Sequence, residues 1–190
     1  TTVSGTPTDE IIYGYDTDWT DKLVSYDGTG ITYDAVGNPL SYRGSTLTWT
    51  KENMLAGVVS GTKAYTYSYD HNGIRSKKTD NSTGARTVYQ MTDGLIVGEK
   101  TVSSSGGVSK QMAFSYDSSD NIIAMSYNGV QYYYVKNAQG DIIGIADGSG
   151  NVVVEYTYDS WGKVLSVTGD TGLGNANPFR YRGYYYDVET

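Results

Sequence analysis

The dipeptide Tyr-Asp recurs along the chain, and in its clearest copies a glycine stands three residues after the aspartate. Tyr-Asp occurs seven times, with its tyrosine at positions 15, 26, 33, 69, 116, 158 and 186. The full phrase appears three times, as Asp34 to Gly37, Asp70 to Gly73 and Asp159 to Gly162. Asp147 to Gly150 repeats it without the tyrosine, and Asp117 to Asp120 has aspartate in place of glycine. Copies at irregular spacing predict β-hairpins of variable length rather than a strict solenoid.

The residues before each phrase alternate in character, as a β-strand requires. Tyr65, Tyr67 and Tyr69 fall on one face of the first such segment. Two later segments alternate in the same way, and one face of each carries Met112, Phe114 and Tyr116 or Val154, Tyr156 and Tyr158. We expect the aspartate to cap the backbone amides two and three residues on. Glycine at the fourth position then supplies the positive φ that closes a hairpin with a G1 bulge. Each phrase predicts a strand, a turn and a second strand.

Composition supports an all-β chain with almost no helix. The 190 residues include 24 glycines and 20 tyrosines but only 2 phenylalanines and 3 prolines. Helical bundles favour Leu, Ala, Glu and Lys, and disordered chains are poor in aromatics, so both classes are excluded. A single helical turn is expected at 51–55, N-capped by Thr50. The polar stretches 80–84, 103–107 and 169–174 predict hairpin loops.

Charge and cysteine content exclude several classes of function. The net charge of −7 disfavours nucleic acid and anionic membrane surfaces, which both require clustered cations. The chain has no cysteine, so disulfides and thiolate metal sites are ruled out. No apolar run is long enough for a membrane helix, and the N-terminal residues do not form a signal peptide, so any export signal is expected to lie outside this chain.

No catalytic residue and no cofactor is predicted. The single histidine, His71, lies within a repeat turn and is interpreted as an exposed turn residue. The aspartates and glycines of the phrases are assigned a structural role in turns; they are Asp34, Gly37, Asp70, Gly73, Asp117, Asp147, Gly150, Asp159 and Gly162. A weak calcium candidate is formed by Asp16, Asp18 and Asp21, without the glycine and glutamate of an EF-hand loop.

The aromatic residues leave two interpretations open. Tyrosines can pack as cross-strand pairs, which bury the ring while the hydroxyl finds a partner, and this interpretation is favoured. The alternative is a carbohydrate-binding surface on which exposed rings stack against sugars, with Trp19, Trp49 and Trp161 as the candidate residues.

The repeated phrases resemble the YD repeats of Rhs-type proteins, which include Rhs toxins, wall-associated proteins, toxin-complex shell proteins and, more distantly, teneurins. The phrase at 37–49 and the run from Asn177 to Thr190 carry the resemblance most specifically, the latter being similar to the entry of the Rhs-associated core region. The resemblance implies successive antiparallel hairpins side by side in a long, twisted, spiralling sheet that forms part of a shell. It also implies a single array over residues 1–190, with 1–14 as a degenerate leading edge and 175–190 as the start of a truncated core region.

The function implied by the resemblance is structural rather than enzymatic. Such a module would form part of the wall of a large secreted or cell-surface bacterial protein that encloses or presents a C-terminal effector. Its expected partners are the neighbouring repeats and that effector, with weak self-association through open strand edges. Glycans are the partners of the alternative, adhesive function.

Overall fold

The computed structural model describes residues 11–187, which divide into two compact units. The first contains the described residues up to Tyr67 together with Asp80–Ser82, and the second contains Ser68–Thr79 and the residues from Thr83 onward. Most of the predicted leading edge at 1–14, and the last three residues of the predicted core region, therefore lie outside the described residues. The prediction of a single array stays a prediction.

The first unit contains two groups of strands. One is a three-stranded antiparallel sheet of β1 (Tyr13–Tyr15), β2 (Leu23–Tyr26) and β3 (Thr29–Gly30). The other runs in chain order through β4 (Ser41–Tyr42), β5 (Ser45–Trp49), β6 (Leu55–Ser60) and β7 (Lys63–Tyr69), whose last two residues belong to the second unit.

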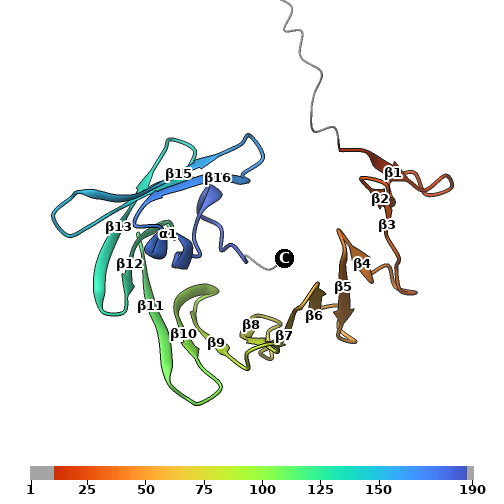
Figure 1. Ribbon diagram of the computed structural model, residues 1–190, viewed down its shortest axis with the longest axis horizontal. Helices are drawn as coiled ribbons and strands as arrows, with labels where there is room; N and C mark the ends of the chain where they lie inside the picture. Colours follow the sequence, from red (N-terminus) through yellow and green to blue (C-terminus); the bar gives the residue numbers. More distant parts are fainter. Residues whose placement is uncertain (1–10, 188–190) are drawn as a thin grey trace, which may run out of the picture. The chain divides into compact units, whose positions relative to one another are not determined.

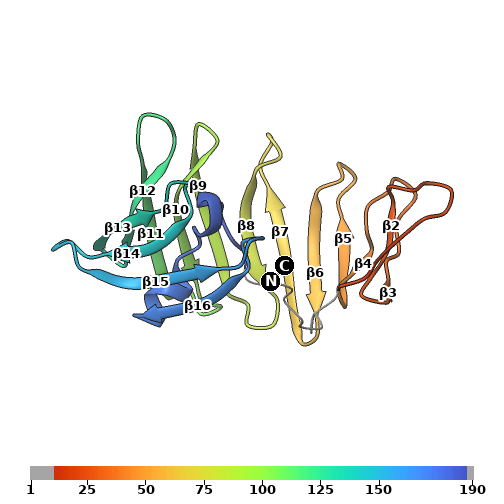
Figure 2. The same ribbon diagram turned by 90° about the horizontal axis from the view of Figure 1, so that it is seen from above.

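The second unit continues the same pattern, each strand pairing antiparallel with the next in the chain. Its strands are β8 (Arg75–Asp80, the last residue grouping with the first unit), β9 (Arg86–Thr92), β10 (Leu95–Val102), β11 (Val108–Tyr116), β12 (Ile122–Tyr127), β13 (Val130–Lys136), β14 (Ile142–Ala146), β15 (Val152–Tyr158) and β16 (Val164–Gly169). A short helix, α1 (Thr171–Ala176), and a 3-10 turn, η1 (Tyr181–Gly183), follow β16. Within this unit the sheet curves, and α1 lies on its concave side (Figures 1 and 2).

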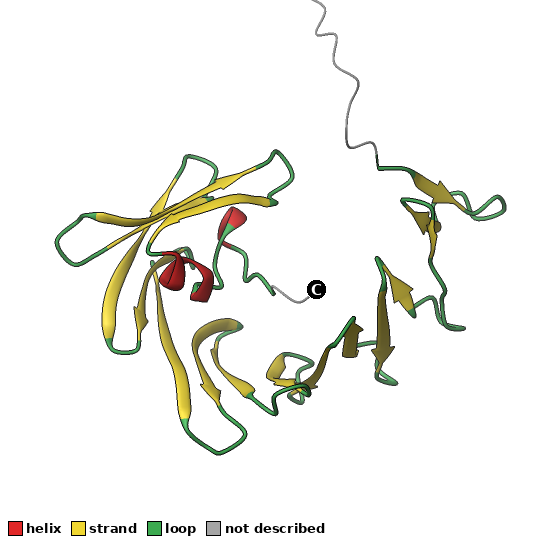
Figure 3. Ribbon diagram, viewed as in Figure 1, coloured by secondary structure: helices red, strands yellow, loops and turns green. Residues whose placement is uncertain are grey.

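Almost all of the regular structure is strand, as the colouring by element makes plain (Figure 3). The predicted all-β fold of successive antiparallel hairpins is therefore confirmed. No helix among the described residues has the length and apolar character needed to cross a membrane.

One five-residue turn recurs throughout the described chain. In each copy the first N–H donates to the fifth carbonyl, the fourth N–H donates to the first carbonyl, and the fourth residue has a positive φ. Glycine holds that fourth position in most copies, and Asn53 and Asp120 hold it in two. This geometry is the G1-bulge hairpin expected from the sequence. The copies span 34–38, 50–54, 70–74, 103–107, 117–121, 137–141, 147–151 and 159–163.

The capping pattern of these turns differs from the prediction in one respect. The side chain of the first residue accepts from the amides two and four residues on, as Asp147 does from Ser149 and Asn151. The amide three residues on is not available, because it already donates to the backbone carbonyl of the first residue. The prediction of a bond to the third residue was therefore wrong for these turns, although Asp16 does cap Asp18 and Trp19 in that way.

Two further local predictions were wrong. The stretch 51–55 is not a helical turn, because Thr50 Oγ1 caps the amides of Glu52 and Met54 in another copy of the hairpin turn. The stretch 169–174 is not a hairpin loop. Asp170 accepts a hydrogen bond from the Leu173 amide at 3.0 Å and so becomes the N-cap of α1.

The hydrophobic core of the second unit lies on the concave face of its sheet. Inward residues of β11, β12, β14 and β15 meet residues that follow β16, and the buried set is Met112, Phe114, Ile122, Met125, Ile142, Ile145, Val154, Tyr156, Leu173 and Phe179. Met112 and Phe114 of β11, and Val154 and Tyr156 of β15, come from the faces predicted by alternation, and the structure shows that these faces point inward. The side chains of Met125, Ile142, Ile145 and Val154 are fully buried.

The carboxylates that cap the turns should make the free energy of unfolding depend on pH in the acid range. The amide and side chain of Asn121, followed by the amide of Ser119, lower the pKa of Asp117 below its ordinary value of 3.8, and Asn151 does the same for Asp147. A carboxyl whose pKa is lower in the folded state stabilises the fold above its unfolded pKa, and this contribution is lost as the pH falls through the folded pKa. We therefore expect the free energy of unfolding to decrease as the pH drops below 3.8.

Urea denaturation across this pH range measures the effect. The double variant Asp117→Asn, Asp147→Asn should lose less stability on acidification than the wild-type chain does. Asp93→Asn, in the turn between β9 and β10, is the matched control, because no hydrogen bond to this carboxylate is found in the described chain. Identical acid profiles for the double variant and the wild type would contradict the assigned role of these carboxylates.

Candidate functional site

The concave face of the second unit is covered by the segment 171–187, here called the inner strap. The strap contains α1, which contacts β15 and β16, and η1, which contacts β14. Gly174 makes this approach possible, because a Cβ at this position would collide with Val167 and Val154. The strap is therefore part of the core of this unit.

Asn177 anchors the strap through a completely enclosed side chain. Its Oδ1 accepts from Tyr134 Oη at 2.8 Å and from the Phe179 amide at 3.2 Å. Its Nδ2 donates to the Phe179 carbonyl at 2.6 Å and to Tyr156 Oη at 3.2 Å. With 1% of its surface exposed, this amide has a partner for each polar atom, as a buried polar group requires.

Phe179 and Arg180 occupy the space next to Asn177. The Phe179 ring packs edge-on against Phe114 at 4.8 Å and against Tyr185 at 5.6 Å between ring centroids. The buried Arg180 guanidinium donates to the carbonyls of Gly174, Asn175 and Asn177, at and just beyond the end of α1. A cation there satisfies carbonyls that the helix leaves without partners.

A buried acid on β10 binds the strap further along the chain. The Glu99 side chain is fully buried, forms an ion pair with Lys110 on β11, and accepts a hydrogen bond from Tyr185 Oη at 2.6 Å. Burial, reinforced by the negative charge of Glu99, raises the pKa of Tyr185 above 10.0. The phenol therefore stays protonated and donates to the carboxylate.

The last described residue of the strap is held by two cations of β8. Asp187 forms ion pairs with Arg75 at 2.5 Å and with Lys78 at 3.3 Å, and its side chain is 15% exposed. Two ion pairs thus hold Asp187 against β8, although the two segments lie more than a hundred positions apart in the sequence.

Tyrosines of the Tyr-Asp dipeptides complete the hydrogen bonding of the sheet. Tyr116 Oη donates to the Ile96 carbonyl and Tyr158 Oη to the Ile142 carbonyl, each at 2.7 Å. Both carbonyls lie next to irregularities in strand register, where ladder bonding is interrupted. Burial raises the pKa of Tyr116 to about 12, so this donor stays protonated.

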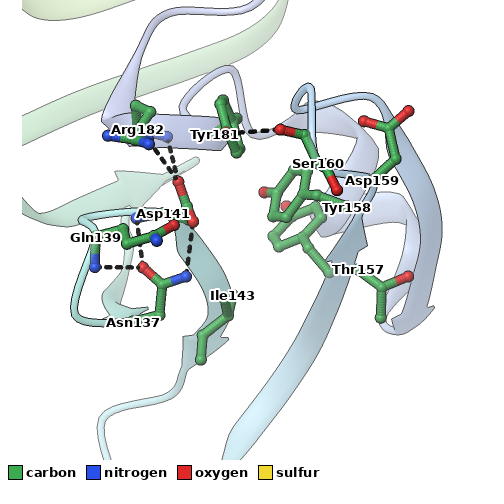
Figure 4. Close-up of a pocket in the computed structure, with 11 residues that line it drawn as sticks. Asn137, Gln139, Asp141, Ile143, Thr157, Tyr158, Asp159, Ser160, Tyr181 and Arg182 are labelled. Atoms are coloured by element: carbon green, nitrogen blue, oxygen red, sulfur yellow. Dashed lines mark hydrogen bonds and ion pairs between the residues drawn. The ribbon is translucent and has the colours of Figure 1, made fainter.

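A pocket of about 500 Å³ opens between two of the five-residue turns, at 137–141 and 159–163 (Figure 4). Its lining also includes Ile143, Tyr156, Thr157, Tyr158, Tyr181 and Arg182. The pocket thus joins the ends of two hairpins to the η1 turn of the inner strap.

The predicted turn residues lie at the first and fourth positions of the recurring turn; they are Asp34, Gly37, Asp70, Gly73, Asp117, Asp147, Gly150, Asp159 and Gly162. The calcium candidates behave differently. Asp16 uses one oxygen to cap its own turn, and the described residues contain no group of three or more acidic or histidine side chains placed to hold a metal ion. Asp16, Asp18 and Asp21 are therefore not brought together as ligands.

The three tryptophans have three different environments. Trp49 is half-buried, and its indole N–H donates to the Pro39 carbonyl at 2.7 Å. Trp19 is 61% exposed and lies beneath the Lys22 ammonium. Trp161 is 91% exposed, in the turn that borders the pocket. Of the three, Trp161 is the one whose ring is most accessible for stacking.

Sequence reasoning did not identify the strap residues that build this site. The run from Asn177 to Arg180 was singled out only for its resemblance to a core region, and nothing indicated that it folds back onto the sheet. One signal was available, because a charged residue amid aromatic neighbours, such as Arg180, must find partners when it is buried.

The comparisons with known proteins place the chain in a family. A family model described as teneurin YD-shell matches residues 17–190. The chain therefore belongs to the YD-shell family, and the predicted Rhs-type relationship is confirmed.

Among curated proteins, the chain is similar to WapA proteins of Bacillus. It is 34% identical to the tRNA3(Ser)-specific nuclease WapA of Bacillus spizizenii and 35% identical to the tRNA nuclease WapA of Bacillus subtilis, each over 172 residues. These matches cover 89% of this chain but 7% of each relative.

Solved toxin-complex structures share the fold. The Tc holotoxin pore of Photorhabdus luminescens matches with a TM-score of 0.66 at 17% identity, over 83% of this chain and 8% of that chain. The TcdB2-TccC3-Cdc42 structure also matches with a TM-score of 0.66, at 16% identity, over 93% of this chain and 11% of that chain.

Removing the Tyr185 hydroxyl should destabilise the second unit. Tyr185→Phe leaves the buried Glu99 carboxylate without one of its donors, which costs about 1–3 kcal/mol. Tyr184→Phe is the matched control, because Tyr184 is 73% exposed. Urea denaturation of both variants measures the difference, and equal stabilities would show that the strap is not held by this bond.

Two glycines with similar backbone angles should respond differently to substitution. Gly150 has a φ of +85° with open space where a methyl group would lie, so Gly150→Ala carries only the backbone penalty of about 1–2 kcal/mol. Gly162 has a φ of +91°, and a Cβ there would also collide with the Tyr181 ring. Gly162→Ala should therefore lower the stability of the fold more than Gly150→Ala does. Thermal denaturation compares the two. An equal loss would mean that Tyr181 does not pack on this turn.

Proposed function

We propose that this chain is a wall segment of a larger secreted or cell-surface bacterial protein, which encloses or presents an effector located C-terminal to it. The observation that carries the proposal is the inner strap, which leaves the last strand and runs along the concave face of the second unit. A chain that follows this path is directed toward the concave side of the sheet rather than its outer face.

The comparisons support the proposal in two ways. Membership of the YD-shell family is consistent with a structural role for the hairpins. The WapA relatives, of which this chain spans 7%, are named as nucleases. In our proposal such an activity belongs to another part of the longer protein, and the hairpin module itself is not catalytic.

The physical role follows from the construction of the wall. Consecutive hairpins joined by short capped turns give a stiff sheet, because each turn fixes its backbone with two or more hydrogen bonds. The strap adds a second layer of apolar side chains to the concave face. A wall of this kind separates an effector from solvent without any chemical step.

Protease protection tests the proposal on the complete protein that contains this chain. Phe179→Asp introduces a charge into the buried aromatic cluster and should detach the strap. We expect the downstream effector to be digested at least fivefold faster in this variant than in the wild type. Tyr184→Asp, at an exposed strap position, is the control and should protect as the wild type does.

Two results would contradict the proposal. One is a reading frame with no further domain after the hairpin region. The other is an effector that is digested at the same rate in the wild type and in Phe179→Asp, with the loss of the strap verified by tyrosine fluorescence.

A further inference from the structure

We propose that Tyr13 and Tyr26 form an oxidative modification site, at which a peroxide joins the two rings through a dityrosine bond. The bond ties β1 to β2 in the first unit. It uses surface rings and no residue of the inner strap, so it is independent of the wall function. Such a site requires two rings in contact and access for an oxidant.

The strands β1 and β2 place the two tyrosines directly opposite each other. Tyr13 is the cross-strand partner of Tyr26 in an antiparallel pair. Side chains at opposed positions of antiparallel strands have Cβ atoms about 4.5–5.5 Å apart. The rings meet edge to face, with 5.4 Å between their centroids and 86° between their planes. The backbone therefore keeps the two phenols within reach of each other.

Both phenols are open to a reagent in solution. The Tyr13 side chain is 51% exposed, and Tyr26 is half-buried. Neither hydroxyl makes a hydrogen bond within residues 11–187, the part of the chain that the structure describes. A phenol without a fixed acceptor can pass its proton to water when an oxidant removes an electron from the ring.

The tyrosine pairs of the second unit are less suited to this reaction. The pairs whose rings are in contact there are Tyr89–Tyr185, Tyr156–Tyr158 and Tyr158–Tyr181. Each contains a hydroxyl that already donates to an acceptor within the fold, because Tyr185 and Tyr158 are both bonded in this way. Burial also raises the pKa of both residues, so their phenols release a proton less readily.

Two neighbours restrain the Tyr26 ring. The Arg43 guanidinium lies 5.0 Å from its centroid, and the Tyr42 ring lies 5.6 Å away. A cation over an aromatic face is attracted by the ring, so the contact with Arg43 limits its rotation. Tyr42 belongs to β4, which pairs with β5 and not with β2, so no strand register sets its distance from Tyr26. Tyr13 is therefore the preferred coupling partner, and its exposed ring turns to meet Tyr26.

The reaction is a two-electron oxidation shared equally by the two rings. Hydrogen peroxide, acting through a haem peroxidase, removes one electron and one proton from each phenol and is reduced to two molecules of water. The two phenoxyl radicals then form a carbon–carbon bond between ring carbons next to the hydroxyls. The hydrogen atoms on those carbons move to the oxygens, which restores both hydroxyls and the aromatic rings.

The bond fastens a small sheet that few residues build. The strand β1 has three residues and β3 has two, and short isolated hairpins are marginally stable in water. The chain has no cysteine, so a disulfide is not available for this purpose. A bond between Tyr13 and Tyr26 closes a loop of the chain and restricts its unfolded state, as a disulfide does.

Treatment of the full chain with hydrogen peroxide and a haem peroxidase tests the proposal, at a protein concentration low enough to suppress coupling between molecules. Trypsin cleaves after Lys22, so Tyr13 falls in the peptide 1–22 and Tyr26 in the peptide 23–43. Mass spectrometry detects the two peptides joined and two hydrogen atoms lighter than their sum, and fragmentation locates the bond.

Conservative variants identify the partners in the bond. Tyr13→Phe keeps the ring but removes the phenol that is oxidised. Tyr15→Phe is the matched control, because Tyr15 lies on the same strand and in the same peptide and is 54% exposed. Its ring has no aromatic partner within the described residues, 11–187.

We expect the wild type to give the joined peptides, linked through Tyr13 and Tyr26. Their yield should fall at least tenfold in Tyr13→Phe and stay unchanged in Tyr15→Phe. The proposal is overturned if no joined peptides form, or if Tyr13→Phe still gives them through Tyr15. It is also overturned if Tyr26 couples mainly to Tyr42 within the peptide 23–43, or if covalent dimers are the main product. None of these outcomes depends on an effector, so failure here leaves the wall function untouched.

Discussion

The fold of the second unit depends on hydrogen-bond partners for the polar backbone of the inner strap, which covers the apolar concave face of the sheet. A segment laid across an apolar sheet must satisfy its own amides and carbonyls there, since each unpaired group costs about 1–3 kcal/mol. Asn177 and Arg180 meet this demand by bonding to the strap carbonyls and to Tyr134 and Tyr156. Their bonds allow Phe179 to enter the core, and the strap then closes over β11 to β15.

The same demand accounts for tyrosine rather than phenylalanine at positions 116 and 158. A curved sheet with frequent register shifts leaves carbonyls without ladder partners. The hydroxyls of Tyr116 and Tyr158 reach such carbonyls while their rings pack inside. In the dipeptides at 116–117 and 158–159, the tyrosine therefore supplies a hydrogen bond that the strand ladder lacks, and the aspartate caps the turn that follows.

Local structure was largely predictable from the sequence, because it depends on interactions between near neighbours. Alternation gave the strands, and the aspartate and glycine of each phrase gave the turns. The errors arose where a backbone group had already been used, as with the amide of Gly150, or where a loop met a distant surface, as with Gly174 in α1. The strap and the pocket were not predictable, because the contacts of Tyr185 with Glu99 and of Arg182 with Asp141 join residues far apart in the chain.

Hydrogen exchange at the strap amides tests the central claim most directly. The backbone amides of Asn177, Phe179 and Arg180 donate to groups inside the second unit, so they should exchange as slowly as those of β12 and β14. The amide of Trp161, in an exposed turn, should exchange much faster. Fast exchange throughout 177–186, alongside slow exchange in β12 and β14, would mean that the concave face is open and that the strap is not part of the core.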